Sequence, residues 1–214
     1  MKLQGLIFDM DGTLGDTVPM CIQAIQHTFH YYTGRTFSPA EIVAMFGYSE
    51  EGLFQRLLPD TWQKAADMYQ AEYEQAHAAF PEPFNGIPAL LASLRRRGVQ
   101  LGIVTGKGPR SSRFSVRTWG LEPYFSGIET GSMDGPVKPH GMRVFLKEWG
   151  LPSQAVAYVG DAASDIDAAR EVGVLAVSAA WAGSTDAEAL AACQPDALFT
   201  RVEDFALWLD EVTQ

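Results

Sequence analysis

Short apolar runs rich in β-branched residues alternate along this chain with longer segments of helical periodicity. The apolar runs cover residues 3–8, 99–104, 155–159 and 174–177, with a weaker one at 197–199. The helical segments cover residues 87–97, 109–119, 142–149 and 163–172. Strands that are apolar at nearly every position are buried on both faces, as in a parallel sheet covered by helices. The sequence therefore predicts a doubly wound α/β sheet.

One connection is too long for this pattern. A parallel crossover needs about a dozen residues, whereas about 90 separate the first strand from the second. Between residues 16 and 84 the periodicity is helical, with turns marked by Gly34 and Gly47. We expect an all-helical cap domain over residues 16–84, inserted into a catalytic core of residues 1–15 and 85–214. Both of its ends join the core near the first strand, so it should lie over that strand's end.

Charge and hydropathy argue against two classes of partner. A formal net charge of −10 repels nucleic acid and anionic membranes at long range. No apolar stretch approaches the roughly 20 residues of a membrane span, and the N-terminal run is too short for a signal peptide. We expect a cytoplasmic protein, as a monomer or a homodimer. Cys21 and Cys193 have no Cys or His at metal-ligand spacing, and we expect both to be buried thiols.

Polar residues directly follow three of the predicted strands. Asp9 and Asp11 follow the first, Thr105 the second, and Asp161 the third, with Asp165 four residues further on. Ligands of open parallel sheets bind at the carboxyl ends of the strands. Carboxylates gathered there repel one another unless a cation lies among them, and all-oxygen ligands favour Mg²⁺ together with a substrate phosphate. The four aspartates therefore predict a Mg²⁺ site that acts on a small phosphorylated metabolite.

Two of these aspartates have the residue type and spacing for phosphoryl transfer. An aspartate can attack phosphorus and form an aspartyl-phosphate that water later hydrolyses, and Asp9 is our candidate. A second carboxylate must protonate the leaving alkoxide and then deprotonate the attacking water. Asp11 is placed for both tasks, and Gly12 lets the chain turn away behind it.

The transferring phosphoryl group is negatively charged and needs donors and cations aimed at it. The Thr105 hydroxyl, the backbone N–H groups of Met10, Asp11 and Gly106, and the Lys138 ammonium can supply them. Each residue also has a structural alternative. Thr105 is a possible helix N-cap, Lys138 a solvated surface lysine, and Asp165 a stabiliser of the helix that it opens.

The inserted helices offer two candidates for substrate binding. Tyr48 and Arg56 flank the turn at Gly47, and Arg56 could hold a substrate anion. The alternative is a packed aromatic ring and a solvated arginine. His27 and His30 have metal-compatible spacing but no third ligand, so we assign them no role.

Taken in order, these motifs resemble those of haloacid dehalogenase superfamily hydrolases. The matching residues are Asp9-Met10-Asp11-Gly12-Thr13-Leu14, Thr105, Lys138-Pro139, and Gly160-Asp161 with Asp165. The chain is most similar to the phosphoglycolate phosphatase-like branch, whose helical cap is inserted where this chain carries residues 16–84.

The resemblance implies a role for each aspartate. Asp9 would be the nucleophile and a metal ligand, and Asp11 the general acid/base and a metal ligand through its backbone carbonyl. Asp161 would complete the protein ligands, and Asp165 would hold the metal or a water bound to it. Gly15 and Gly141 stand where the family usually has a larger apolar residue and a proline, so we expect a looser backbone there.

The sequence thus predicts a phosphoric monoester hydrolase and leaves its substrate open among phosphoglycolate, sugar phosphates, nucleotides and pyrophosphate. A phosphomutase of the same fold, similar to β-phosphoglucomutase, keeps both Asp9 and Asp11 and is the main alternative. A catalytically silent binding module is the other, and the intact motif set argues against it. Dehalogenases of this superfamily lack the second aspartate.

Overall fold

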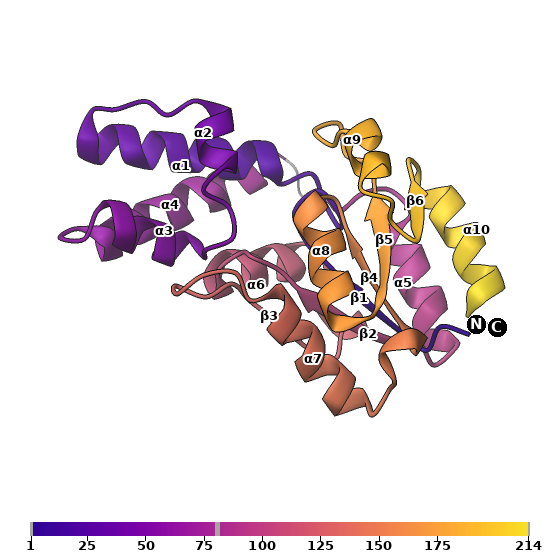
Figure 1. Cartoon of the computed structure of the whole chain (residues 1–214). Coiled ribbons are helices and arrows are strands. Elements are labelled where there is room, and N and C mark those ends of the chain that lie inside the picture. Colours follow the sequence, from indigo (N-terminus) through magenta and orange to yellow (C-terminus); the bar gives the residue numbers. More distant parts are fainter. Residues whose placement is uncertain (1, 80–81, 214) are drawn as a thin grey trace.

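The computed structural model describes residues 2–79 and 82–213, in which six parallel strands form one sheet (Figure 1). Their order is β3-β2-β1-β4-β5-β6. The strands are β1 (Gly5–Phe8), β2 (Gln100–Val104), β3 (Ile128–Glu129), β4 (Val156–Gly160), β5 (Leu175–Ala179) and β6 (Ala197–Phe199). Phe8, the last residue of β1, pairs with Ile103 of β2 and Val159 of β4. The chain therefore leaves β1 at Asp9 with the ends of both neighbouring strands beside it.

Helices cover both faces of the sheet. One face carries α5 (Ile87–Arg96), α6 (Pro109–Thr118) and α10 (Val202–Val212), and the other carries α7 (Lys138–Trp149), α8 (Ala163–Val172) and α9 (Ala187–Ala192). Within β1, Leu6 and Phe8 point into the first apolar layer and Ile7 into the second, and all three are fully buried. The prediction of a doubly wound α/β sheet is confirmed.

Strand β3 and helices α9 and α10 were absent from the sequence prediction, and α7 begins earlier than expected. Strand β3 has two residues, too few for a recognisable apolar run, and α9 and α10 flank the short β6. Helix α7 begins at Lys138 rather than at residue 142, because Pro139 lies in its first turn, where a missing N–H costs nothing. Lys138 is therefore held by a helix and not by a loop.

The expected looseness at Gly15 and Gly141 is wrong, because both glycines allow close packing. A Cβ at Gly15 would lie 2.4 Å from Cζ2 of Trp119, and one at Gly141 would lie 2.9 Å from Cγ1 of Val104. The expectation of two buried thiols also fails in part. Cys21 is buried, whereas Cys193 is half-buried just after α9.

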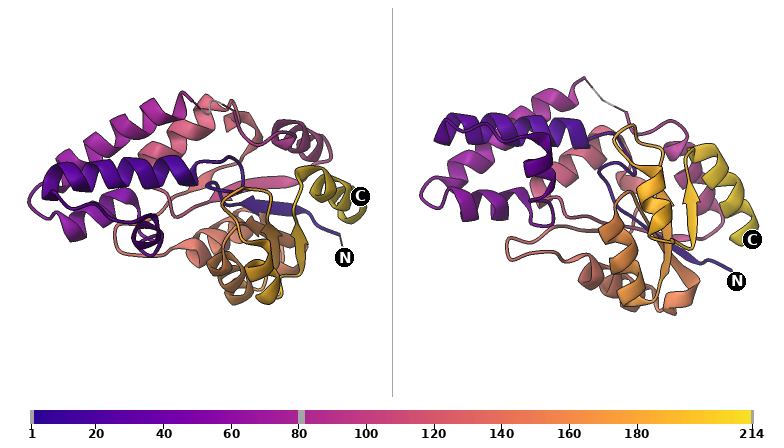
Figure 2. Two further views of the ribbon diagram at one scale, coloured as in Figure 1. Left: turned by 90° about the horizontal axis from the view of Figure 1, so that it is seen from above. Right: turned by 45° about the horizontal axis from the view of Figure 1, so that its top comes forward.

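The segment between β1 and α5 folds into helices with an apolar core of their own. These helices are α1 (Val18–Thr33), α2 (Pro39–Val43), α3 (Glu50–Leu57) and α4 (Trp62–His77). They gather at one end of the molecule, with both termini at the opposite end (Figure 2). The N–H of Phe84 donates to the carbonyl of Leu14 at 2.9 Å, so the chain leaves and re-enters the sheet domain at adjacent points.

We propose that residues 16–84 form a cap domain, called the cap below, and that the rest of the chain is the core. Within the described ranges, no helix is long and apolar enough to cross a membrane.

Candidate active site

Three carboxylates and one lysine meet at the carboxyl end of the sheet. Asp9 follows β1, Asp161 follows β4, and Asp165 lies in the first turn of α8; one oxygen from each lies within 4.8 Å of the others. From the first turn of α7, Lys138 Nζ lies 2.6 Å from Asp9 Oδ2 and 2.5 Å from Asp165 Oδ1. We call these four residues the core cluster.

Backbone geometry brings the core cluster together. Gly12, with a φ of +71°, turns the chain after Asp9 so closely onto Asp161 that a Cβ there would lie 2.1 Å from Asp161 Oδ2. Asp165 Oδ2 accepts the N–H of Ala162 at 3.0 Å, so this side chain also stabilises the start of α8. The interpretation of Asp165 as a stabiliser of the helix that it opens therefore describes a contact that it makes, and its role as a metal ligand stays a prediction.

The core cluster carries more negative charge than its lysine compensates. Burial raises the pKa of Asp161 to about 8, and the neighbouring Asp9 and Asp165 carboxylates reinforce the rise. Burial also raises the pKa of Asp9 to about 6, although Lys138 opposes this. Three clustered carboxylate oxygens with this charge fit a hard divalent cation such as Mg²⁺.

The loop after β2 supplies donors for an anion. Thr105 is buried, and its Oγ1 accepts the N–H of Lys107 at 3.2 Å, which leaves its O–H free to donate. The interpretation of Thr105 as a helix N-cap is wrong, because the residue that precedes α6 at that position is Gly108. In the described part of the chain, the N–H groups of Asp11 and Gly106 donate to no other residue.

The N–H of Met10 has a partner already. It donates to Asp9 Oδ1 at 2.7 Å, while Lys138 holds Asp9 Oδ2. Met10 thus fixes the carboxylate of Asp9 rather than offering its N–H to a ligand. Its side chain is fully buried in the core.

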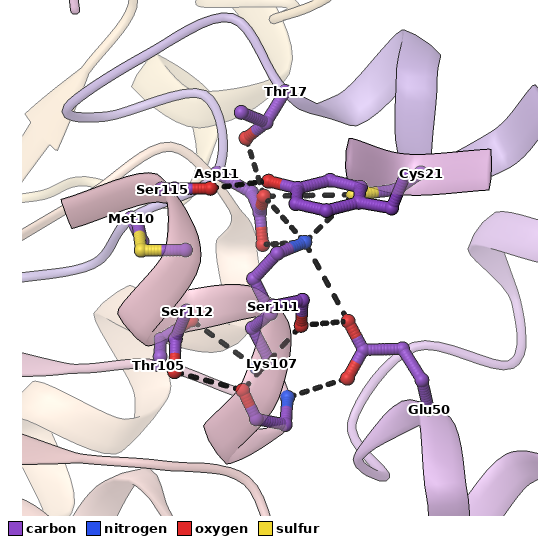
Figure 3. Close-up of polar contacts among 12 residues, drawn as sticks. Met10, Asp11, Thr17, Cys21, Glu50, Thr105, Lys107, Ser111, Ser112 and Ser115 are labelled. Carbon is purple, nitrogen blue, oxygen red and sulfur yellow. Dashed lines mark hydrogen bonds and ion pairs between the residues drawn. The ribbon is translucent and has the colours of Figure 1, made fainter. Parts of the chain in front are cut away.

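The carboxylate of Asp11 points toward the cap and lies outside the core cluster (Figure 3). Its Oδ1 accepts hydrogen bonds from Thr17 Oγ1 and from Lys107 Nζ, the latter at 3.1 Å. Cys21 Sγ lies 3.6 Å from the same oxygen. Lys107 also lies 3.5 Å from Oε1 of Glu50, the first residue of α3.

Sequence reasoning missed Lys107 and Glu50. Lys107 stands two residues after Thr105 in the loop that follows β2, and this position could have identified it. Glu50 opens a cap helix with an acidic first turn, a pattern typical of any solvated helix start. No sequence signal distinguishes it.

The two predicted substrate contacts of the cap form a pair at its rim. The guanidinium of Arg56 lies 4.6 Å from the ring centroid of Tyr48. Tyr48 borders the segment that precedes α7, where a Cβ at Gly135 would lie 3.7 Å from its ring. Arg56 is exposed and forms no ion pair with any described residue. The structure does not bring this pair into hydrogen-bond contact with the core cluster.

The sequence pattern of the haloacid dehalogenase-like hydrolase family matches residues 6–179, a span that holds all of the core cluster. The chain belongs to this family. Phosphoglycolate phosphatase from Synechococcus elongatus is 30% identical over 216 residues, covering 99% of this chain and 98% of the relative. Pyrophosphatase PpaX from Bacillus pumilus is 31% identical over 93% of each chain.

Two solved structures share the fold of this chain. A haloacid dehalogenase-like hydrolase from Streptococcus pneumoniae superposes with a TM-score of 0.74 at 25% identity, over 96% of this chain and 98% of that one. CbbY from Rhodobacter sphaeroides, in complex with xylulose-(1,5)bisphosphate, superposes with a TM-score of 0.77 at 20% identity, over 92% and 93%. The prediction of a phosphatase of this family is confirmed.

Proposed function

We propose that this protein is a Mg²⁺-dependent phosphatase that hydrolyses a small phosphomonoester through an aspartyl-phosphate on Asp9. The core cluster carries the proposal: a buried carboxylate with both oxygens held, beside two further carboxylates and a lysine. The relatives named phosphoglycolate phosphatase and pyrophosphatase support a small phosphorylated substrate.

Asp9 is oriented for attack on phosphorus. Its carboxylate is held by the Met10 N–H on one oxygen and by Lys138 on the other. One of these oxygens forms the bond to phosphorus as the bond from phosphorus to the leaving oxygen breaks. The Thr105 hydroxyl and the N–H groups of Asp11 and Gly106 donate to the phosphoryl oxygens, where negative charge accumulates.

Asp11 handles the protons. It gives a proton to the leaving oxygen in the first half-reaction and takes one from the attacking water in the second. That water adds to phosphorus, the bond from phosphorus to Asp9 breaks, and inorganic phosphate leaves.

The residues present fit a metal ion. Asp9, Asp161 and Asp165, together with the backbone carbonyl of Asp11, would hold Mg²⁺, which when bound neutralises charge on the phosphoryl oxygens.

Phosphate release from a panel of compounds tests this function. The panel contains phosphoglycolate, pyrophosphate, sugar phosphates and nucleotides, each with Mg²⁺ and with excess EDTA. We expect release that requires Mg²⁺ and is concentrated on one class of compound. Isomerisation without release would indicate a phosphomutase, and neither activity on any compound would contradict the proposal.

A further inference from the structure

Lys107 is a buried cation at the junction of the core and the cap. Its side chain is 1% exposed, although it belongs to a loop. Its Nζ lies 3.1 Å from Asp11 Oδ1, 2.8 Å from Cys21 Sγ and 3.5 Å from Glu50 Oε1 (Figure 3). It also lies 4.3 Å from the ring centroid of Tyr73 in α4. One core residue therefore contacts three helices of the cap and the carboxylate of Asp11.

Glu50, on the cap side of the junction, is also firmly held. Its carboxylate is buried and accepts hydrogen bonds from the Gly108 N–H at 2.5 Å, the Ser111 hydroxyl at 2.8 Å and the Tyr69 hydroxyl at 2.9 Å. Gly108 and Ser111 open α6, so this carboxylate lies at the N-terminus of a core helix, where an anion is favoured. Glu50 thus fixes α3 on the core directly beside Lys107.

The contacts of Lys107 distinguish the two oxygens of Asp11. Oδ1 is close to three donors, Thr17, Lys107 and Cys21, whereas among the described residues Oδ2 has only the longer 3.5 Å contact with Lys107. Oδ1 is therefore the anchored oxygen, and Oδ2 is the one available for exchanging a proton with a substrate. A lysine removed from water is tolerated only when its donors are satisfied, and these partners satisfy them.

We propose that Lys107 is a positioning residue for Asp11 and that Glu50 of the cap holds Lys107 in place. This inference rests on the proposed function, in which Asp11 is the general acid/base. The orientation of Asp11 thereby depends on the docking of α3 of the cap on α6 of the core. Lys107 itself does not touch the reacting atoms.

Leaving groups of different acidity test this role. The value of kcat/KM reports the steps up to formation of the aspartyl-phosphate, and p-nitrophenolate leaves with little need of a proton, whereas an alkoxide requires one. The assay compares p-nitrophenyl phosphate with the alkyl phosphate that the wild-type enzyme hydrolyses fastest. Lys107→Met should lower kcat/KM for the alkyl ester about 100-fold and for the aryl ester less than about 5-fold. Glu50→Gln should also lower kcat/KM more for the alkyl ester than for the aryl ester, with about a 10-fold loss for the alkyl ester.

A second ion pair between the core and the cap provides the matched control. Arg110 of α6 pairs with Asp67 of α4 at 2.6 Å, but both side chains are exposed and neither contacts Asp11. Arg110→Met should change both kcat/KM values less than about 2-fold, as expected for a surface ion pair.

Each of the following outcomes would overturn the inference. Equal losses of kcat/KM for the two esters in Lys107→Met would show that Lys107 has a merely structural role. No loss for either ester would show that Lys107 has no role in the reaction. If Lys107→Met does not fold by circular dichroism, Glu50→Gln decides alone, and equal losses or none would again overturn it. A wild-type enzyme that releases phosphate from neither ester in Mg²⁺ would refute the proposed function itself, and this inference with it.

Discussion

Asp9 and Asp11 are two residues apart, yet they lie in two differently built regions. The core cluster around Asp9 is assembled from the ends of β1 and β4 and from the first turns of α7 and α8. The contacts of Asp11 come from both sides of the junction, with Lys107 from the core and Thr17 and Cys21 from the cap side, and Glu50 of the cap contacts Lys107 in turn. If Asp9 and Asp11 have the proposed roles, we expect the core alone to place the nucleophile and the orientation of the acid/base to depend on the docked cap.

The largest expected effect is that of Asp9→Asn. The change is nearly isosteric but removes the nucleophile, so kcat should fall at least about 10⁴-fold. The thermal midpoint should stay within a few degrees, because Lys138 keeps its contact with Asp165. Steady-state phosphate release and thermal unfolding measure the two effects, and near wild-type turnover would remove Asp9 from its assigned role.

Asp11→Asn should have a smaller effect that depends on the ester. The variant cannot donate or accept the required proton, so hydrolysis of an alkyl phosphate should fall about 10²–10⁴-fold. Transfer from p-nitrophenyl phosphate to Asp9 should be much less affected, because that leaving group needs little protonation. A stopped-flow measurement of nitrophenol release would separate the two steps. If the rates for the aryl and alkyl esters fell by the same factor, Asp11 would not have the role of a general acid distinct from that of Asp9.

Metal removal should destabilise the core cluster in a pH-dependent way. Folding raises the pKa of Asp161 to about 8 and that of Asp9 to about 6, from an ordinary value of 3.8. The stability contributed by such carboxyl groups is fully present below the ordinary pKa and is lost as the pH rises through the folded-state value. Asp9 and Asp161 should therefore cause the metal-free protein to lose stability from about pH 4 to about pH 8.

Mg²⁺ binds the charged carboxylates and should reverse that loss. At 100 times its dissociation constant it stabilises the folded state by about 2.7 kcal/mol, which is roughly 5–10 °C in the thermal midpoint for a chain of this size. Thermal unfolding with Mg²⁺ or EDTA should show a larger difference at pH 8 than at pH 6. The absence of any Mg²⁺ effect at pH 8 would contradict the assigned metal site.

The smallest expected effect is that of Arg56→Ala at the rim of the cap. An exposed charge contributes about 0.2–1 kcal/mol, so the KM for an anionic substrate should rise by less than about 5-fold with kcat unchanged. Initial-rate measurements over a range of substrate concentrations test this, with Arg110→Ala as the exposed-arginine control. A large fall in kcat would instead place Arg56 among the groups that contact the transition state.

The same comparison explains what the sequence could and could not predict. Asp9, Asp161 and Asp165 were found because strand ends in a parallel sheet converge, whatever the loops do. Strand β3 was missed because a two-residue strand has no periodicity. The start of α6 at Pro109 was predicted correctly, and this start makes Gly108 the N-cap, so the interpretation of Thr105 as an N-cap placed it three residues too early.

The surroundings of Asp11 could not be predicted, for a different physical reason. Glu50 becomes a buried carboxylate only because α3 docks on the N-terminus of α6, and this contact joins residues 58 positions apart. Before docking, Glu50 resembles the exposed acid that opens many helices. Its role is a property of tertiary packing and leaves no local pattern.

Trapping the phosphoenzyme tests the central claim most directly. Asp11→Asn, mixed with p-nitrophenyl phosphate and Mg²⁺ and quenched in acid, should accumulate one phosphoryl group on the peptide that contains Asp9. Its yield should match the burst of nitrophenol, because this variant hydrolyses the intermediate slowly. Nitrophenol release with no phosphoryl group on the protein, or with the group on another peptide, would contradict the account.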